Sequence, residues 1–283
     1  MNKNLFVVTF FLVGLAFYLG TKYQPSKPKV APSPTPLAQQ NILPDSVDLQ
    51  VSFGDLIVKM VKGGAIDKEK FLKRHPEADQ LLSATSNSNI VVTSQNSALI
   101  LNLLWPLGIS NKAKVLSEGI MGTQYKDKIG SFASTGGWTL GAREGGKLFD
   151  SQSLIKLTSE QEELVKNISA NIYRPCCGNS TAFPDCNHGA GMLGFVEMAV
   201  ASGMPENEIY KKALALNSYW FPQTYTELAV FFKAKKNIDW KNVDPKEILG
   251  ESYSSGRGYG AVSQQLQNEG LTPQVKSGGG CGV

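Results

Sequence analysis

The chain has 283 residues, of which 42% are hydrophobic and 18% are charged, so it is long enough to bury a substantial core. Its formal net charge is only +4, and the Lys and Arg residues are spread along the sequence. This distribution argues against nucleic acid as a partner, because phosphate backbones are bound by clustered positive charge.

The first 23 residues predict a membrane-spanning helix. An uninterrupted uncharged run covers residues 5–20, between Lys3 and Lys22. As a helix this run is about 24 Å long, slightly short of the hydrocarbon core of a bilayer. A cleavable signal peptide would end in small residues, whereas this run ends in two aromatic residues, a leucine and a glycine. We therefore expect residues 1–23 to be an uncleaved signal anchor.

Residues 24–44 predict a Pro-rich linker. They contain six prolines, which disfavour a helix or a central strand and favour an extended spacer. An N-terminal anchor followed by such a spacer is typical of an exported domain held away from a membrane. We therefore expect a single-pass protein of the cell membrane, with residues 45–283 forming an extracytoplasmic globular domain.

The sequence of residues 45–283 predicts one mainly α-helical domain. Hydrophobic positions recur at helical spacing, and Gly or Pro residues punctuate them. The predicted helices cover residues 45–64, 66–82, 94–108, 111–122, 159–173, 188–203, 205–220, 224–236, 244–252 and 260–270. Pro76 interrupts the second helix, and Pro106 is expected to end or bend the third.

Local patterns refine these helices. Ser159 with Glu162, and Thr224 with Glu227, predict capping boxes at two helix starts. Small residues on one side of 188–203 predict a close approach by another helix or a ligand.

Two Gly-rich stretches interrupt the helical pattern. Residues 123–149 predict a long irregular loop or a pair of short strands, either functional or a surface crossing held by Trp138. The stretch 254–260 matches no phosphate-binding pattern. We expect it to be a flexible hinge, and the alternative is an anion-binding site at Arg257.

The stretch RPCCGNSTAFPDCNHGAGM, residues 174–192, holds three of the four cysteines and one of the two histidines. Asp185 or Asn187 is expected to cap a helix that begins near His188, which puts Cys186 at its N-terminus. A helix N-terminus stabilises a thiolate and lowers its pKa. Met192 lies four residues after His188 and would share its face of the helix.

The fourth cysteine, Cys281, follows three glycines near the end of the chain. An extended tail after Gly270 spans up to roughly 40 Å, far enough to fold back. We therefore expect Cys281 to lie beside the other cysteines.

Three kinds of site fit this cluster. Four cysteines in an exported protein can form two disulfides. Alternatively, Cys177, Cys186, His188 and Cys281 would make a Cys₃His zinc site, and exchanging one thiolate for Met192 would favour copper. A third possibility is thiol redox chemistry at Cys186, although no Cys-x-x-Cys motif is present.

The leading hypothesis is a membrane-anchored, extracytoplasmic protein that binds zinc or copper. The proposed ligands are drawn from the Cys/His cluster and its neighbours: Cys176, Cys177, Cys186, His188, Cys281 and Met192. The alternatives are a disulfide-stabilised structural or interaction domain at the cell surface, and a thiol-redox protein. No hydrolase motif occurs, and no feature points to a particular protein partner.

Two further residues have simple expectations. His75 has charged neighbours and no cysteine nearby, so it is expected at the surface. Glu197 would either support the metal ligands from its place on the same helix or lie on a solvated helix face.

Overall fold

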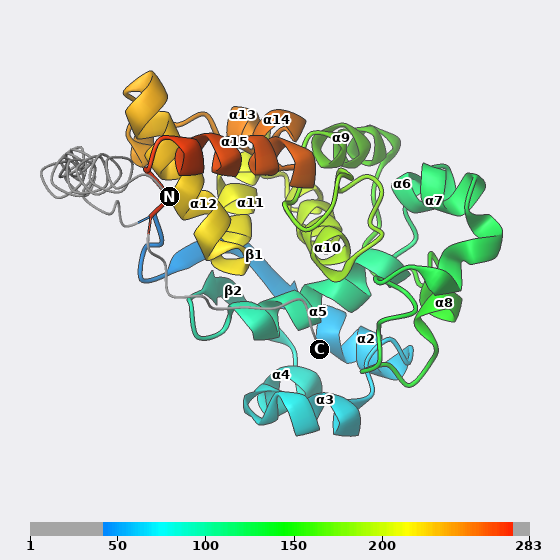
Figure 1. The fold of residues 1–283 in the computed structure, drawn as a ribbon. Coiled ribbons are helices and arrows are strands. Elements are labelled where there is room, and N and C mark those ends of the chain that lie inside the picture. Colours follow the sequence, from blue (N-terminus) through cyan, green and yellow to red (C-terminus); the bar gives the residue numbers. More distant parts are fainter. Residues whose placement is uncertain (1–41, 274–283) are drawn as a thin grey trace, which may run out of the picture. The chain divides into compact units, whose positions relative to one another are not determined.

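The structure, a computed structural model, describes residues 42–273, and most of these residues are helical. They lie within one compact unit that contains a single two-stranded sheet (Figure 1). The mainly α-helical fold class predicted from the sequence is therefore confirmed for this part of the chain.

The elements, in chain order, are β1 (Val47–Gly54), α2 (Leu56–Lys62), α3 (Lys68–Arg74), η1 (Pro76–Ala78), α4 (Asp79–Ser83), β2 (Ser86–Val92), α5 (Ser97–Ser110), α6 (Lys114–Ser117), α7 (Ile120–Thr123), η2 (Lys126–Ser131), α8 (Gly145–Leu148), α9 (Ser159–Ala170), α10 (Asn187–Ala201), α11 (Glu206–Trp220), α12 (Pro222–Phe231), η3 (Phe232–Lys236), η4 (Trp240–Asn242), α13 (Pro245–Leu249), α14 (Glu251–Ser254) and α15 (Gly256–Asn268).

Two buried helices, α5 and α10, form the centre of the fold and pack most extensively against each other (Figure 1). Both are mostly apolar and are buried on nearly all sides, as expected for helices surrounded by protein. Their backbones approach closely because glycines face each other across the contact. A Cβ on Gly108 would lie 1.9 Å from the carbonyl oxygen of Ala190, and one on Gly194 would lie 2.6 Å from that of Leu104. The predicted close approach along residues 188–203 is confirmed.

The helix predicted for residues 45–64 is wrong in its first half, which forms strand β1. Leu49, Val51 and Phe53 alternate with more exposed residues, and this period of two buries one face of the strand. Strand β1 pairs in antiparallel fashion with β2, with Val47 opposite Val92. The sequence prediction followed the helical spacing of the second half, where α2 does form.

The Gly-rich residues 123–149 form no strands, but turns, the 3₁₀ helix η2 and the short helix α8. Trp138 holds this segment against the core. Its ring lies 4.9 Å from that of Trp105, and its indole Nε1 donates a 2.7 Å hydrogen bond to the carbonyl of Ala65. The predicted irregular loop, rather than the pair of short strands, is confirmed, and a functional role for this segment stays a prediction.

The two predicted capping boxes have different outcomes. Helix α9 has a capping box, but it is formed by Thr158 and Gln161, one residue earlier than predicted. The predicted box of Thr224 and Glu227 is wrong. Helix α12 begins at Pro222, so both residues lie buried inside it.

Two predicted interruptions are largely helical. Pro106 does not end α5, which continues to Ser110. In the stretch 254–260, α14 ends at Ser254, Ser255 caps α15 and that helix begins at Gly256, so the break is confined to one residue and its flexibility stays a prediction. Arg257 is exposed there and pairs with Glu251.

The predicted anchor (residues 1–23), most of the Pro-rich linker and Cys281 lie outside the described residues. Between residues 42 and 273, no helix combines the length and the apolar character that crossing a bilayer requires. Membrane attachment and export therefore stay predictions.

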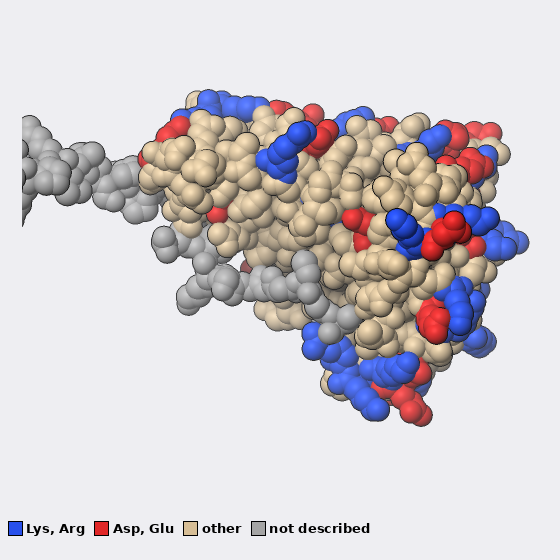
Figure 2. Space-filling view, turned by 45° about the vertical axis from the view of Figure 1, so that its right-hand side comes forward, with Lys and Arg blue, Asp and Glu red and all other residues tan. Residues whose placement is uncertain are grey.

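Charged side chains of both signs are interspersed on the face drawn in Figure 2, and no continuous basic patch gathers there. Among the described residues, many charged side chains form ion pairs at the surface, such as Lys68 with Asp79 and Lys147 with Glu144. The absence of a nucleic-acid partner stays a prediction from the sequence.

Candidate metal centre

The cysteine cluster lies where the loop of residues 171–186 meets the start of α10. Cys186 has extended backbone angles and is itself the N-cap of the helix. Its Sγ accepts a 3.4 Å hydrogen bond from the backbone N–H of Gly189. The predicted position of Cys186 at a helix N-terminus is confirmed, although the cap is neither Asp185 nor Asn187. The sulfur takes the place of a capping oxygen and faces the positive end of the helix.

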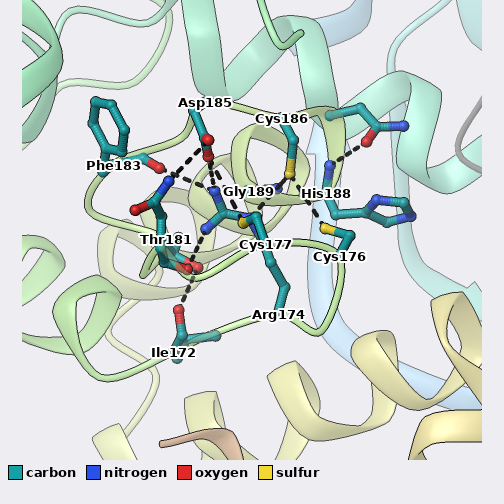
Figure 3. Close-up of polar contacts among 12 residues, drawn as sticks. Ile172, Arg174, Cys176, Cys177, Thr181, Phe183, Asp185, Cys186, His188 and Gly189 are labelled. Atoms are coloured by element: carbon teal, nitrogen blue, oxygen red, sulfur yellow. Dashed lines mark hydrogen bonds and ion pairs between the residues drawn. The ribbon is translucent and has the colours of Figure 1, made fainter. Parts of the chain in front are cut away.

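Three potential ligands meet around this sulfur. The Sγ atoms of Cys176 and Cys186 are 3.6 Å apart (Figure 3). Together with a ring nitrogen of His188, they lie within 4.8 Å of one another. Cys176, Cys177 and Cys186 are all free thiols. The loop thus gathers two sulfurs and an imidazole at one point, a set that can hold a metal ion.

Cys177 belongs to a second group, with Asp185 and Cys186, whose ligand atoms also lie within 4.8 Å of one another. The carboxylate of Asp185 is engaged elsewhere, however. It forms an ion pair with Arg174 and accepts a 2.9 Å hydrogen bond from the side chain of Asn179. The first group is therefore the better metal site, because a thiol and an imidazole stand in place of this paired carboxylate, while Cys186 belongs to both groups.

Arg174 organises the cluster, and sequence reasoning missed it. Its side chain is only 1% exposed. Nε donates a 3.0 Å hydrogen bond to the Sγ of Cys186, and the guanidinium also bonds the carboxylate of Asp185 and the carbonyls of Asn179 and Phe183 (Figure 3). One buried cation therefore ties the loop together along its length. Arg174 opens the quoted Cys-rich stretch, but nothing in the residue pattern indicated its burial.

Gly189 leaves the space that the guanidinium occupies. A Cβ at this position would lie 2.5 Å from the Cζ atom of Arg174. Any larger residue at position 189 would therefore displace Arg174 from the sulfur of Cys186.

The contacts among the three thiols shift their pKa values in different directions. Hydrogen bonds from Cys176 and Cys177, and then from His188, hold the pKa of Cys186 well below its ordinary value of 9.0, with help from the charge of Arg174. The hydrogen bonds of Cys176 to Cys177 and Cys186 raise the pKa of Cys176. Cys186 is therefore the first of the three to become a thiolate, the form that binds metals.

The electrostatics of Arg174 and Cys177 follow from the same contacts. Burial opposes the charge on Arg174, but Cys186, Cys177 and Asp185 outweigh it and raise the pKa of Arg174. The hydrogen-bonding contact with Cys176 lowers the pKa of Cys177. The contact with Cys186 and burial raise this pKa, and the net shift is upward.

His188 is buried, with 5% of its surface exposed. Its ring lies 4.4 Å from the ring of Phe221 and 5.7 Å from that of Trp220. Aromatic neighbours on α11 and at the start of α12 thus fix an imidazole beside the sulfurs, as the prediction of a ligand requires.

Two predicted ligands are not placed at the cluster. Met192 is 1% exposed and belongs to the hydrophobic core, so its role as a ligand stays a prediction. Cys281 lies outside the described residues, and the predicted return of the tail stays a prediction as well.

The surface prediction for His75 is wrong. His75 is 7% exposed, and its Nε2 lies 2.8 Å from the side-chain nitrogen of Asn102 on α5. The charged residues beside it in sequence did not reveal that the ring turns toward the core.

The solvated helix face predicted as one alternative for Glu197 is also wrong, because this residue is fully buried. Its Oε2 accepts a 3.1 Å hydrogen bond from Asn111, whereas Oε1 has no partner. Glu197 is nine residues after His188, roughly 13 Å along the helix, so it does not support the ligands directly.

No family model matches the chain, and neither a curated protein nor a solved structure shows significant similarity to it. The geometry of the Cys/His cluster is therefore the main basis for a function.

Proposed function

We propose that this protein binds one soft transition-metal ion, copper(I) or zinc, through Cys176, Cys186 and His188. The observation that carries the proposal is the meeting of two free thiols and one imidazole within 4.8 Å. Thiolates and imidazole are the donors that select these ions over magnesium or calcium.

The number of donors bears on which ion is bound. Copper(I) accepts three donors of this kind, whereas zinc in proteins almost always takes four. A zinc site would recruit a further ligand, for which the neighbouring Cys177 and the tail residue Cys281 are the candidates. The proposed metal ligands differ in solvent exposure, because Cys176 is exposed whereas His188 is buried. An ion could enter and leave from the side of Cys176, which suits a binding or handling role.

We further propose that the site works outside the cytoplasm, on a domain held at the membrane by residues 1–23 through the Pro-rich linker. The support for this step is the uncharged run and the proline content of the sequence.

A metal titration of the full chain, reduced and purified in detergent, tests the proposal. Copper(I) and zinc are added separately under anaerobic conditions, in competition with a chromogenic chelator. We expect one ion to bind per chain. The variants Cys186→Ser and His188→Gln should each weaken binding by at least about 100-fold, since each removes a ligand rather than a supporting contact.

The chain offers a matched control, because its second histidine is also buried. His75→Gln should leave metal affinity unchanged. The proposal fails if the wild type takes up neither ion, or if His188→Gln binds as tightly as His75→Gln. Two disulfides and no metal in native protein would instead support the disulfide framework.

A further inference from the structure

The sulfurs of Cys176 and Cys186 are already in van der Waals contact, at 3.6 Å. A disulfide requires about 2.05 Å, so an approach of roughly 1.5 Å would close the bond. Both thiols are free.

Cys176 and Cys186 differ in solvent exposure and in the hydrogen bonds that hold their sulfurs in place. Cys176 is exposed and lies on the turn after Pro175. Cys186 is partly buried, and its sulfur is held by Arg174 Nε at 3.0 Å and by the backbone N–H of Gly189 at 3.4 Å. An incoming reagent therefore reaches Cys176 first, with the sulfur of Cys186 fixed behind it.

We propose that Cys176 and Cys186 form a reversible disulfide by exchange with a small-molecule disulfide, and that this bond switches the metal site off. In the first step the exposed Cys176 thiol gives its proton to the adjacent Cys186 thiolate as its sulfur attacks one sulfur of the reagent RSSR, which forms Cys176–S–S–R and releases RS⁻. The released RS⁻ then takes this proton from Cys186 and leaves as RSH. In the second step the Cys186 thiolate attacks the Cys176 sulfur and releases a second RS⁻.

The exchange is balanced. Two protein thiols lose two electrons and two protons, and RSSR becomes two RSH. The reverse reaction with excess RSH restores both thiols.

The consequence for the metal rests on the proposed function. The disulfide consumes two of the three donors and leaves only the imidazole of His188. Binding then requires the reduced pair, so the redox state of the surroundings decides whether the site can hold an ion.

Cys177 is the competing partner for Cys186, because its Sγ also lies within 4.8 Å of the Sγ of Cys186. Its Sγ lies 3.9 Å from a carboxylate oxygen of Asp185, and its carbonyl accepts a 2.7 Å hydrogen bond from the backbone N–H of Gly256 on α15. A bond between the adjacent Cys176 and Cys177 would also be strained. Cys177→Ser is therefore the matched control.

Disulfide mapping of the metal-free full chain tests the first part of the proposal. The reduced protein, in detergent, is equilibrated with glutathione at increasing ratios of oxidised to reduced form, and free thiols are then alkylated. Cleavage before Asp185 separates Cys176 from Cys186, so their link appears as a pair of joined peptides. We expect the link in the wild type and in Cys177→Ser, and no link to Cys186 in Cys176→Ser.

Copper(I) titration of the same samples tests the switch. The fraction of chains that bind copper(I) should fall in step with the linked fraction and recover after addition of reduced glutathione. Linked protein that binds copper(I) undiminished would overturn the switch. A link that joins Cys186 to Cys177 or Cys281 instead, or the absence of any link, would overturn the disulfide itself.

These outcomes are separable from failure of the proposed function. If the reduced protein binds no metal but the link between Cys176 and Cys186 forms, the metal site is refuted and only the thiol exchange stands. If metal binds to reduced protein and no link forms, the proposed function stands and this inference is wrong.

Discussion

Two buried ionisable residues lie near opposite ends of helix α10, and their surroundings differ. Arg174 lies in the loop before the helix, and Glu197 lies on the helix itself. At the N-terminal end, Arg174 is buried with four acceptors around its guanidinium, among them Asp185 and the sulfur of Cys186. Further along, Glu197 is fully buried with one donor, Asn111, and one oxygen without a partner.

The difference shows in which form of each group the fold favours. Neighbouring acceptors keep Arg174 charged despite its burial. Burial raises the pKa of Glu197 well above its ordinary value of 4.5, and the acids Glu162 and Asp150 add to this, so the neutral form is favoured. A buried charge with four hydrogen-bond acceptors therefore marks the candidate site, whereas burial disfavours the charge of the poorly partnered acid in the core.

The largest expected effect on stability comes from removing the buried charge of Arg174. Arg174→Met leaves Asp185 and the thiolate of Cys186 without their cation, so the free energy of unfolding should fall by about 3–5 kcal/mol. Urea unfolding monitored by circular dichroism measures it. Arg257→Met is the control, because Arg257 is 89% exposed and its loss should change little. A loss below about 1 kcal/mol for Arg174→Met would show that the guanidinium does not support the loop.

A smaller effect is expected when the guanidinium of Arg174 is kept but displaced. In Gly189→Ala the new methyl group collides with the guanidinium of Arg174, which should cost about 1–3 kcal/mol of stability. Copper(I) affinity should fall as well, because the contact between Arg174 and Cys186 is disturbed. Gly260→Ala on α15 is the control, since no atom lies within 4 Å of its added Cβ and a helical alanine should be neutral or stabilising. Equal stability of the two variants would contradict this role of Gly189.

The smallest effect concerns the poorly partnered acid and depends on pH. Glu197 stays protonated in the folded chain after the unfolded chain has lost its proton, so its contribution is complete below pH 4.5 and declines as pH rises toward the raised pKa of Glu197. The decline approaches roughly 1.4 kcal/mol per pH unit. Glu197→Gln should remove this slope and be more stable than the wild type at pH 7.

Urea unfolding at several pH values between 4 and 8 checks this prediction. Glu163→Gln, an exposed substitution on the neighbouring helix α9, should leave the pH dependence as it is in the wild type. Identical pH profiles for Glu197→Gln and the wild type would mean that Glu197 is ionised in the folded protein.

Much of the helical organisation could be predicted from the sequence. The predicted helix 188–203 corresponds to α10 at Asn187–Ala201, and 205–220 corresponds to α11 at Glu206–Trp220. Local signals sufficed there because apolar spacing and helix-ending glycines act within a few residues. The error at β1 has a local cause too, since a short strand followed at once by a helix mixes two periodicities in one window.

The candidate site was predictable only in part. The crowding of Cys176, Cys186 and His188 in a short stretch indicated a common site, and the structure brings these three together. The partner set of Arg174 was not predictable, because its acceptors depend on how the loop of residues 171–186 folds back on itself. Spacing along the chain carries no signal for such contacts.

The sequence by itself determined that the domain is mainly helical, and that three sulfurs and an imidazole lie on one short segment around the start of a helix. Only the tertiary structure decided which of these atoms meet and which charges are buried beside them. The physical reason is range: helix formation and capping depend on neighbours a few residues away, whereas burial depends on residues that the fold brings together from distant parts of the chain.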